Sequence, residues 1–168
     1  SFVKDISISL AEGTTLHKIL DQCANAVVDY LDAAFARIWT LNEKENILEL
    51  QASAGVYTHI DGSHSRIPVG KFKIGRIAQE RKPHLTNSIF DDEYISDKDW
   101  AKREGLVSFA GYPLIVEGHL VGVIAMFACK PLTEFTTRAL ASVSDIIALG
   151  IDRKQSEESL RVSESKYR

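Results

Sequence analysis

The sequence of 168 residues is long enough for one ordinary domain with a hydrophobic core and short for two. Its net charge of −3 provides no basic face, so we expect no nucleic-acid partner. The longest apolar run, LVGVIAMFAC at 120–129, is far below the ~18 residues of a membrane span, and the two distant cysteines fit a reducing compartment. We therefore expect a cytoplasmic protein without membrane insertion.

The first third of the sequence predicts two helices and a β-hairpin. Residues 2–10 are ambiguous between helix and strand, and we favour helix. Residues 14–33 predict a helix with Thr14 as its N-cap. Its apolar residues recur at three- and four-residue steps: Leu16, Leu20, Cys23, Val27 and Leu31. Cys23 on this stripe indicates a core residue rather than a reactive thiol. The β-rich stretches 34–41 and 46–54 flank the polar NEKEN and predict a hairpin.

The middle of the sequence predicts a loop and short elements. Residues 55–70 contain three glycines and one proline without a sustained period, which predicts a long loop of the kind that is often functional. Residues 71–82 predict a helix that ends at Pro83. A brief strand is expected at 84–87, and a helix capped by Ser96 at 96–105.

The last third predicts a hairpin and a long helix. The apolar stretches 106–116 and 119–128 flank Glu117–Gly118, a pair typical of a hairpin turn, which leaves His119 facing solvent. Residues 133–168 predict one helix capped by Thr133, apolar on one stripe up to Ile151 and highly charged beyond it. The fold class is therefore α+β, with a mainly antiparallel sheet flanked by helices.

The sequence contains no strong phosphate-binding, metal-binding or catalytic motif. GKFKIGR at 70–76 has the glycine spacing of a phosphate loop, but Arg76 and Ile77 stand where lysine and a hydroxyl residue belong. HIDGSH at 59–64 gathers three weak metal-ligand candidates, His59, Asp61 and His64; a polar surface loop is the better interpretation, and we predict no metal site. No sequence pattern of a catalytic nucleophile is present.

One cation among large aromatic residues is a more informative pattern. Arg37 and Trp39 share a strand face with Phe35 by alternation. An arginine among aromatic side chains is found either in a ligand cavity or in ordinary packing at the sheet, and the sequence leaves both interpretations open. In a cavity, Arg37 would pair with an anionic or carbonyl group of a ligand. The pocket candidates are Arg37, Trp39, Phe90, Trp100, Phe109 and Tyr112, with Tyr94 in the same aromatic set.

Three stretches carry a resemblance to a known family: ASAGVYTHIDG, RIPVGKFKIGRIAQERKPHLTN and FAGYPLIVEGHLVGVIAMF. They resemble a GAF domain, a small-molecule-sensing module related to PAS domains, and more specifically the GAF modules of bacterial multidomain sensor histidine kinases. The resemblance covers residues 1–152. Residues 153–168, with EESLRVSESKYR, resemble a helical linker that leads into a PAS domain. The family implies six antiparallel strands between helices, with a pocket on one face under long loops.

The resemblance implies a non-catalytic sensing and dimerisation module of a two-component signalling protein. Pocket state would pass through the C-terminal helix to a downstream PAS or kinase domain. A structural spacer without ligand and a stand-alone enzyme of this fold are the alternatives. Neither cysteine matches the position of a bilin attachment site, so no covalent bilin is expected, and the cofactor and ligand stay unknown. The motif of GAF domains that bind cyclic nucleotides is matched only in part, by Asn87, Phe90, Asp92 and Glu93.

A homodimer is expected through the terminal helices. Small residues on the last helix would allow close approach of a second chain, and larger ones would supply apolar contact. The first set is Ala139, Ala148 and Gly150, and the second is Val143, Ile147 and Ile151. Leu160 and Tyr167 are seven residues apart, as coiled-coil positions are.

Overall fold

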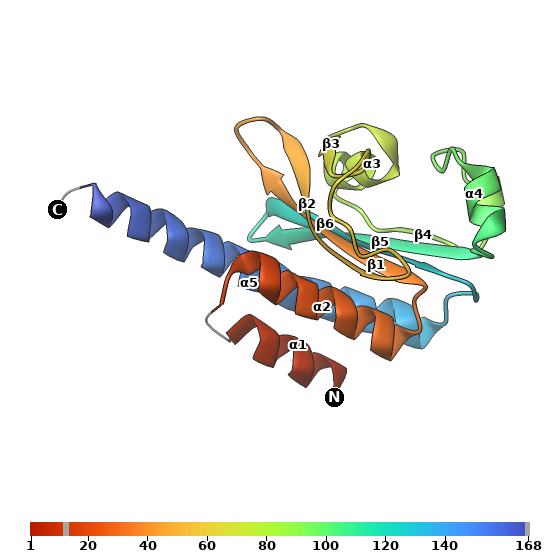
Figure 1. The fold of residues 1–168 in the computed structure, drawn as a ribbon, viewed down its shortest axis with the longest axis horizontal. Coiled ribbons are helices and arrows are strands. Elements are labelled where there is room, and N and C mark those ends of the chain that lie inside the picture. Colours follow the sequence, from red (N-terminus) through yellow and green to blue (C-terminus); the bar gives the residue numbers. More distant parts are fainter. Residues whose placement is uncertain (12–13, 167–168) are drawn as a thin grey trace.

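Six strands form one antiparallel sheet in the computed structural model, which describes residues 1–11 and 14–166 (Figure 1). The order across the sheet is β3-β2-β1-β6-β5-β4. The strands are β1 (Phe35–Asn42), β2 (Ile47–Gly55), β3 (Arg66–Pro68), β4 (His84–Thr86), β5 (Ser108–Val116) and β6 (His119–Ala128). The helices are α1 (Phe2–Ala11), α2 (Leu16–Leu31), α3 (Phe72–Glu80), the 3-10 turn η1 (Ile89–Asp91), α4 (Lys98–Arg103) and α5 (Glu134–Ser165). The predicted α+β class is confirmed.

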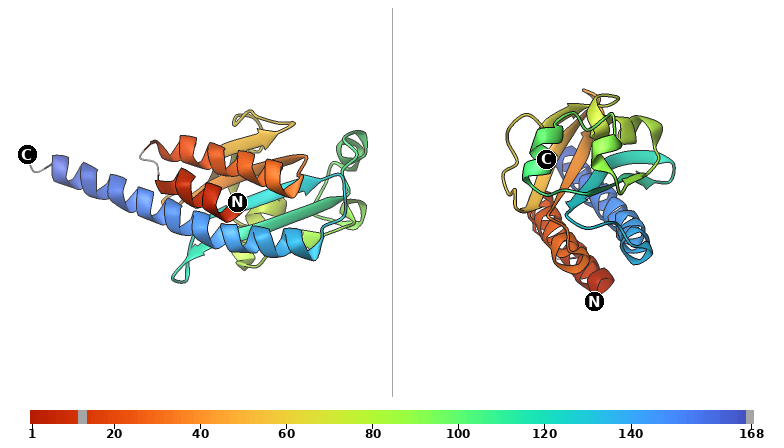
Figure 2. Two further views of the ribbon diagram at one scale, coloured as in Figure 1. Left: turned by 90° about the horizontal axis from the view of Figure 1, so that it is seen from below. Right: turned by 90° about the vertical axis from the view of Figure 1, so that its right-hand side faces the viewer.

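Helices α2 and α5 cover one face of the sheet, and α1 packs against both of them (Figure 2). The apolar stripe of α2 packs there, and Leu20, Cys23 and Val27 are fully buried. The helix begins one residue later than expected: Thr15, not Thr14, is the N-cap, and its hydroxyl accepts a hydrogen bond from the Lys18 amide at 3.3 Å. Both threonines can cap a helix, so the sequence did not distinguish them.

Helix α5 is continuous, as predicted, and Thr133 caps it by accepting a hydrogen bond from the Thr136 amide at 3.1 Å. The residues predicted for a dimer seam lie elsewhere than expected. Val143, Ile147 and Ile151 are fully buried in the core of their own chain, and Leu10 of α1 packs against Gly150. The prediction erred because one apolar stripe serves either intramolecular or intermolecular packing. Tyr167 lies outside the described residues.

From residue 155 to 166, every described side chain of α5 and its C-cap is exposed. This part of the helix projects away from the sheet (Figure 1). None of the described helices combines the length and the apolar character that crossing a membrane requires.

The predicted hairpin joins β5 to β6. Its turn residues Glu117 and Gly118 have φ values of 49° and 81°, as a type I′ turn requires. His119 opens the returning strand and is exposed, as expected, with its Nε2 atom 3.6 Å from Asp152 Oδ1.

The other face of the sheet is covered by shorter segments (Figure 1). Strand β3 lies inside the stretch predicted to be only loop, and it pairs with β2. Helix α4 is capped by Asp97 rather than Ser96, because the Asp97 carboxylate accepts a hydrogen bond from the Trp100 amide at 2.9 Å. This face has its own apolar cluster, which includes Phe35, Trp39 and Phe109.

Candidate ligand cavity

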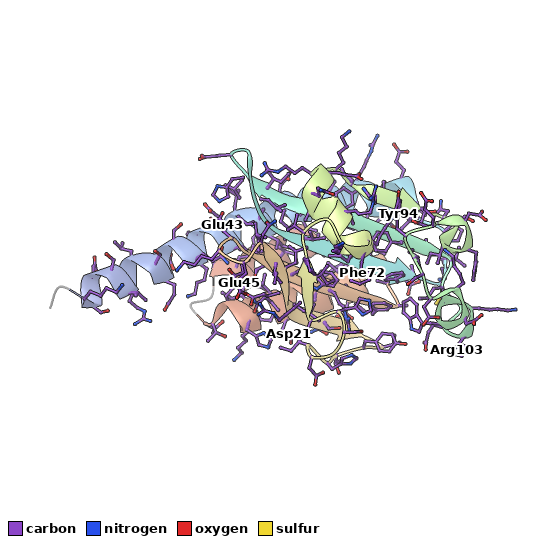
Figure 3. All side chains as sticks on the ribbon, turned by 90° about the horizontal axis from the view of Figure 1, so that it is seen from above. Asp21, Glu43, Glu45, Phe72, Tyr94 and Arg103 are labelled. Carbon is purple, nitrogen blue, oxygen red and sulfur yellow. The ribbon has the colours of Figure 1, made fainter. Side chains whose placement is uncertain are left out.

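A cavity of about 420 Å³ lies on the face of the sheet opposite the long helices. Its floor comes from β1, β5 and β6, and its walls come from the segment after β2, from the start of α3 and from residues 94–100. Figure 3 views this side, with Phe72 and Tyr94 labelled. The lining residues are Phe35, Arg37, Trp39, Tyr57, His59, His64, Phe72, Lys73, Ile74, Tyr94, Ile95, Ser96, Asp97, Trp100, Phe109, Ala125 and Phe127.

Arg37 is the buried cation of this cavity, with 9% of the residue exposed. Its Nε–H donates to the Ser53 hydroxyl at 3.0 Å, and that hydroxyl donates to the Tyr57 carbonyl at 2.6 Å. Its Nη2 lies 3.4 Å from His59 Nε2. No described carboxylate lies within ion-pair distance of its guanidinium. Burial lowers the pKa of Arg37, since loss of water disfavours the charged form.

Both tryptophan side chains of the site are hydrogen-bonded to the segment after β2. The Trp39 indole N–H donates to the His64 carbonyl at 2.9 Å. The Trp100 indole N–H donates to the Tyr57 hydroxyl at 2.9 Å. These two bonds connect the 56–65 segment to β1 and to α4, so the segment forms a wall of the cavity.

Aromatic rings form much of the lining. The Phe35 and Phe127 rings stack, with centroids 4.8 Å apart. The Trp100 ring meets both edge-on, at 5.9 Å from Phe35 and 5.4 Å from Phe127. Phe109 lies 5.0 Å from Phe127 on the neighbouring strand. Such edge and stacked pairs are favourable, and they give the cavity firm apolar walls.

The second cation, Lys73, is neutralised by an aspartate. Lys73 Nζ lies 2.5 Å from Asp92 Oδ2, and the two side chains are 13% and 9% exposed. Burial works to raise the pKa of Asp92, but the hydrogen bonds from Lys73 and the Tyr94 amide, with the charges of Lys73 and Lys98, lower it overall. The pair therefore links α3 to the turn after η1 while both groups are charged.

The structure brings most, but not all, of the predicted pocket residues together. Arg37, Trp39, Trp100 and Phe109 line the cavity, as does Tyr94. Tyr112 lies on the opposite face, where its hydroxyl donates to the Thr137 carbonyl of α5 at 3.1 Å. Strand alternation explains this, because residues an odd number apart point to opposite faces. Phe90 is 47% exposed on η1 and is not part of the lining.

Several lining residues went unnoticed in the sequence. Phe127 could have been found, because it pairs with Phe35 across the β1–β6 ladder and so shares its face. Tyr57 and Lys73 carry no such signal, since they come from a loop and from the start of a helix.

The weak metal candidates do not form a metal centre in the described residues. His59 and His64 line the cavity, but Asp61 does not, and no described group of three or more histidine, cysteine or acidic side chains could hold an ion. Loss of water around the ring lowers the pKa of His64, and the nearby charge of Arg37 lowers it further. Neither cysteine lines the cavity: Cys23 is buried under the helices, and Cys129 is exposed at the end of β6.

Solved structures share this fold at low sequence identity. The GAF domain of an Acinetobacter phosphoenolpyruvate-protein phosphotransferase is 18% identical with a TM-score of 0.78, over 94% of this chain and 95% of that one. The free methionine-R-sulfoxide reductase of Neisseria meningitidis, in complex with its substrate, is 14% identical with a TM-score of 0.75, over 93% and 89%. The A. aeolicus nlh2 GAF domain in an inactive state is 17% identical with a TM-score of 0.75, over 91% and 94%.

At the level of sequence, no curated protein matches the chain. The sequence profile described as GAF domain matches residues 13–152, which is most of the chain. That range includes all six strands and every residue of the cavity lining. The chain therefore belongs to the GAF domain family, a sensory and regulatory fold of signalling proteins.

Proposed function

We propose that residues 1–152 are a non-catalytic, small-molecule-sensing and dimerisation module of a cytoplasmic two-component signalling protein. Residues 153–168 are a helical linker toward a downstream PAS or kinase domain. Occupancy of the cavity biases the position or packing of α5, and this change is the output of the module. The family membership supports a sensory role.

The observation that carries this proposal is that the cavity and α5 contact opposite faces of the same strands. Strand β5 contributes Phe109 to the cavity, and it contacts α5 extensively on its other face. A ligand that shifts the cavity floor therefore acts on a strand that α5 packs against. A change at the cavity does not have to pass through further layers of residues to reach α5, because α5 packs directly on a strand of the cavity floor.

A spacer with a collapsed pocket is less well supported. A concave, largely aromatic lining with a few polar groups is the form that small-molecule sites take. Here a recess of about 420 Å³ has such a lining, which includes the cation of Arg37. Energetically, a buried charge without an ionic partner is costly unless a ligand compensates it.

A thiol-based enzyme is also less well supported. Burial raises the pKa of Cys23 to about 12, and its side chain lies in the core on the helix side of the sheet. Cys129 is exposed, near the Glu104 carbonyl, outside the cavity lining. None of the described residues that line the cavity is therefore a sulfur nucleophile.

The dimerisation part of the proposal keeps Leu160 and replaces the buried apolar residues of α5 with other exposed side chains. Leu149 and Leu160 on α5 are each 60% exposed, and Val3 and Ile8 on α1 are 46% and 45% exposed. The two helices contact each other, so these side chains belong to neighbouring helices on the surface. A second copy of the chain would cover apolar groups that otherwise face water.

The sensing proposal is tested by native mass spectrometry of the protein purified from its own host, followed by hydrogen exchange. We expect a bound small molecule, and slower or faster exchange in α5 when it is stripped. The matched variant Tyr112→Phe keeps the cavity lining but loses the hydrogen bond to α5, so it should bind the molecule with a smaller change in α5. Turnover of the molecule, or unchanged α5 exchange between the occupied and the stripped protein, contradicts the proposal.

A further inference from the structure

The guanidinium of Arg37 is held in place and incompletely bonded. Ser53 and His59 engage its Nε and Nη2 atoms, whereas no described residue accepts a hydrogen bond from Nη1. Ser53 is itself fixed by its bond to the Tyr57 carbonyl. The remaining donors of the arginine fork therefore have a defined direction before any ligand arrives, and binding does not have to order them.

The charge of Arg37 also has no ionic partner among the described residues of the cavity lining. Lys73 is paired with Asp92, and the exposed Asp97 carboxylate caps α4. No described carboxylate balances Arg37. One unpaired positive charge is best neutralised by a ligand with one negative charge, and the two oxygens of a carboxylate match the fork of a guanidinium. A dianion would carry a second charge that has no free partner here.

The aromatic part of the lining favours an apolar, ring-shaped body. Phe35, Trp100 and Phe127 line the cavity with aromatic rings, and Phe72, which also lines it, is 64% exposed. Covering such surfaces with another ring is favourable. An engineered cavity of about 150 Å³ holds benzene. A space of about 420 Å³ is therefore suited to a body larger than one ring.

We propose that this cavity binds a two-ring aromatic monocarboxylate, with its carboxylate on Arg37 and its rings against Trp100 and Phe127. This inference rests on the proposed sensing function and deepens it by naming the ligand class. Arg37 sets the charge of the ligand, and the aromatic lining sets its shape.

The test is isothermal titration calorimetry with three probes: 2-naphthoate, its neutral isostere 2-naphthamide, and the aliphatic dianion glutarate. We expect 2-naphthoate to bind most tightly, by roughly tenfold or more over each of the others. Arg37→Gln should remove that preference, and Arg37→Lys should restore only part of it, because lysine keeps the charge without the fork. The control variant Arg66→Gln removes an exposed arginine from β3 and should leave the affinities for all three probes unchanged.

Folding of the variants is checked by their thermal midpoints. Arg37→Gln removes a buried and uncompensated charge, so its midpoint without ligand should equal or exceed that of the parent protein. Equal affinity for naphthoate and naphthamide, or unchanged binding by Arg37→Gln, overturns the charge assignment. Tighter binding of glutarate overturns the ring assignment. Absence of naphthoate binding below about 1 mM overturns the ligand class as a whole. In each of these cases, a small molecule found by native mass spectrometry in the protein from its own host would still support the sensing function. Protein purified from its own host without any bound small molecule would contradict the sensing function as well.

Discussion

Phe109 and Tyr112 stand three residues apart on β5 and serve opposite faces of the sheet. Phe109 lines the cavity, and the Tyr112 hydroxyl donates to the Thr137 carbonyl of α5 at 3.1 Å. One short strand segment thus contacts both the candidate ligand site and the helix that projects from the domain. The two contacts can be altered separately, which makes their roles testable.

We expect Tyr112→Phe to lower the free energy of unfolding by roughly 1 kcal/mol, the usual net value of one hydrogen bond. Burial raises the pKa of Tyr112, so its hydroxyl is a proton donor at neutral pH. Chemical denaturation measures the change. Phe109→Leu is the comparison variant, because it alters the cavity floor and leaves the bond to Thr137 in place. A Tyr112→Phe protein that binds cavity ligands as poorly as Arg37→Gln would show that the two faces are not separable.

The two cysteines should differ sharply in reactivity. Cys23 is fully buried, and burial raises its pKa to about 12, whereas Cys129 is exposed. Since the thiolate is the reactive form, we expect a thiol reagent at pH 8 to modify only Cys129 in the native protein and both cysteines after unfolding. The Cys129→Ser variant should then be unreactive until it unfolds. Rapid native labelling of that variant would mean that the α2 side of the core opens readily.

The Lys73–Asp92 pair predicts a specific pH dependence of stability. The pKa of Asp92 is lowered in the folded protein, so the folded state binds its proton less readily than the unfolded chain does. The pair therefore contributes stability above the unfolded pKa of about 3.9, and this contribution is lost as the pH falls through the lower folded-state pKa. Unfolding free energies measured from pH 6 to pH 3 should fall less steeply for Asp92→Asn than for the parent protein.

A double-mutant cycle assigns this effect to the ion pair. In the Lys73→Gln background, adding Asp92→Asn should change the pH dependence much less than it does in the parent background. Equal effects in both backgrounds would assign the lowered pKa to the Tyr94 amide and to Lys98 instead.

Dimerisation through the terminal helices predicts that chain length controls the oligomeric state. We expect the full chain to sediment as a dimer at micromolar concentrations, and a chain truncated after Ile151 to dissociate more readily. The truncation removes the exposed Leu160 but none of the core residues of α5. Leu160→Asp in the full chain is the point-mutation equivalent. Monomers for both lengths would place any dimer contact outside these residues.

Local signals in the sequence were sufficient for most of the secondary structure. The Glu117–Gly118 turn and the Thr133 cap could be predicted because each depends on neighbouring residues alone. The choice between Thr14 and Thr15, or between Ser96 and Asp97, could not, because both candidates have a suitable side chain and tertiary packing decides the first turn.

The cavity was only half predictable. Arg37 and Trp39 could be assigned to one face by alternation, and the same rule applied to β5 would have removed Tyr112. The far wall depends on where Tyr57, Lys73 and Trp100 meet, and these residues come from three separate segments. The buried face of α5 illustrates a related limit: an apolar stripe shows that a helix is covered, but not by which chain.

The bonds made by the two indole rings have a spectroscopic consequence. Trp39 and Trp100 are the only tryptophans in the sequence, and both line the cavity. Each donates its N–H to a residue of the same wall segment, Trp39 to His64 and Trp100 to Tyr57. Any molecule that enters the cavity or displaces that wall segment changes the surroundings of both indole rings at once. The intrinsic emission excited near 295 nm therefore reads out cavity occupancy in the unmodified chain, without an attached dye and without background from a distant tryptophan.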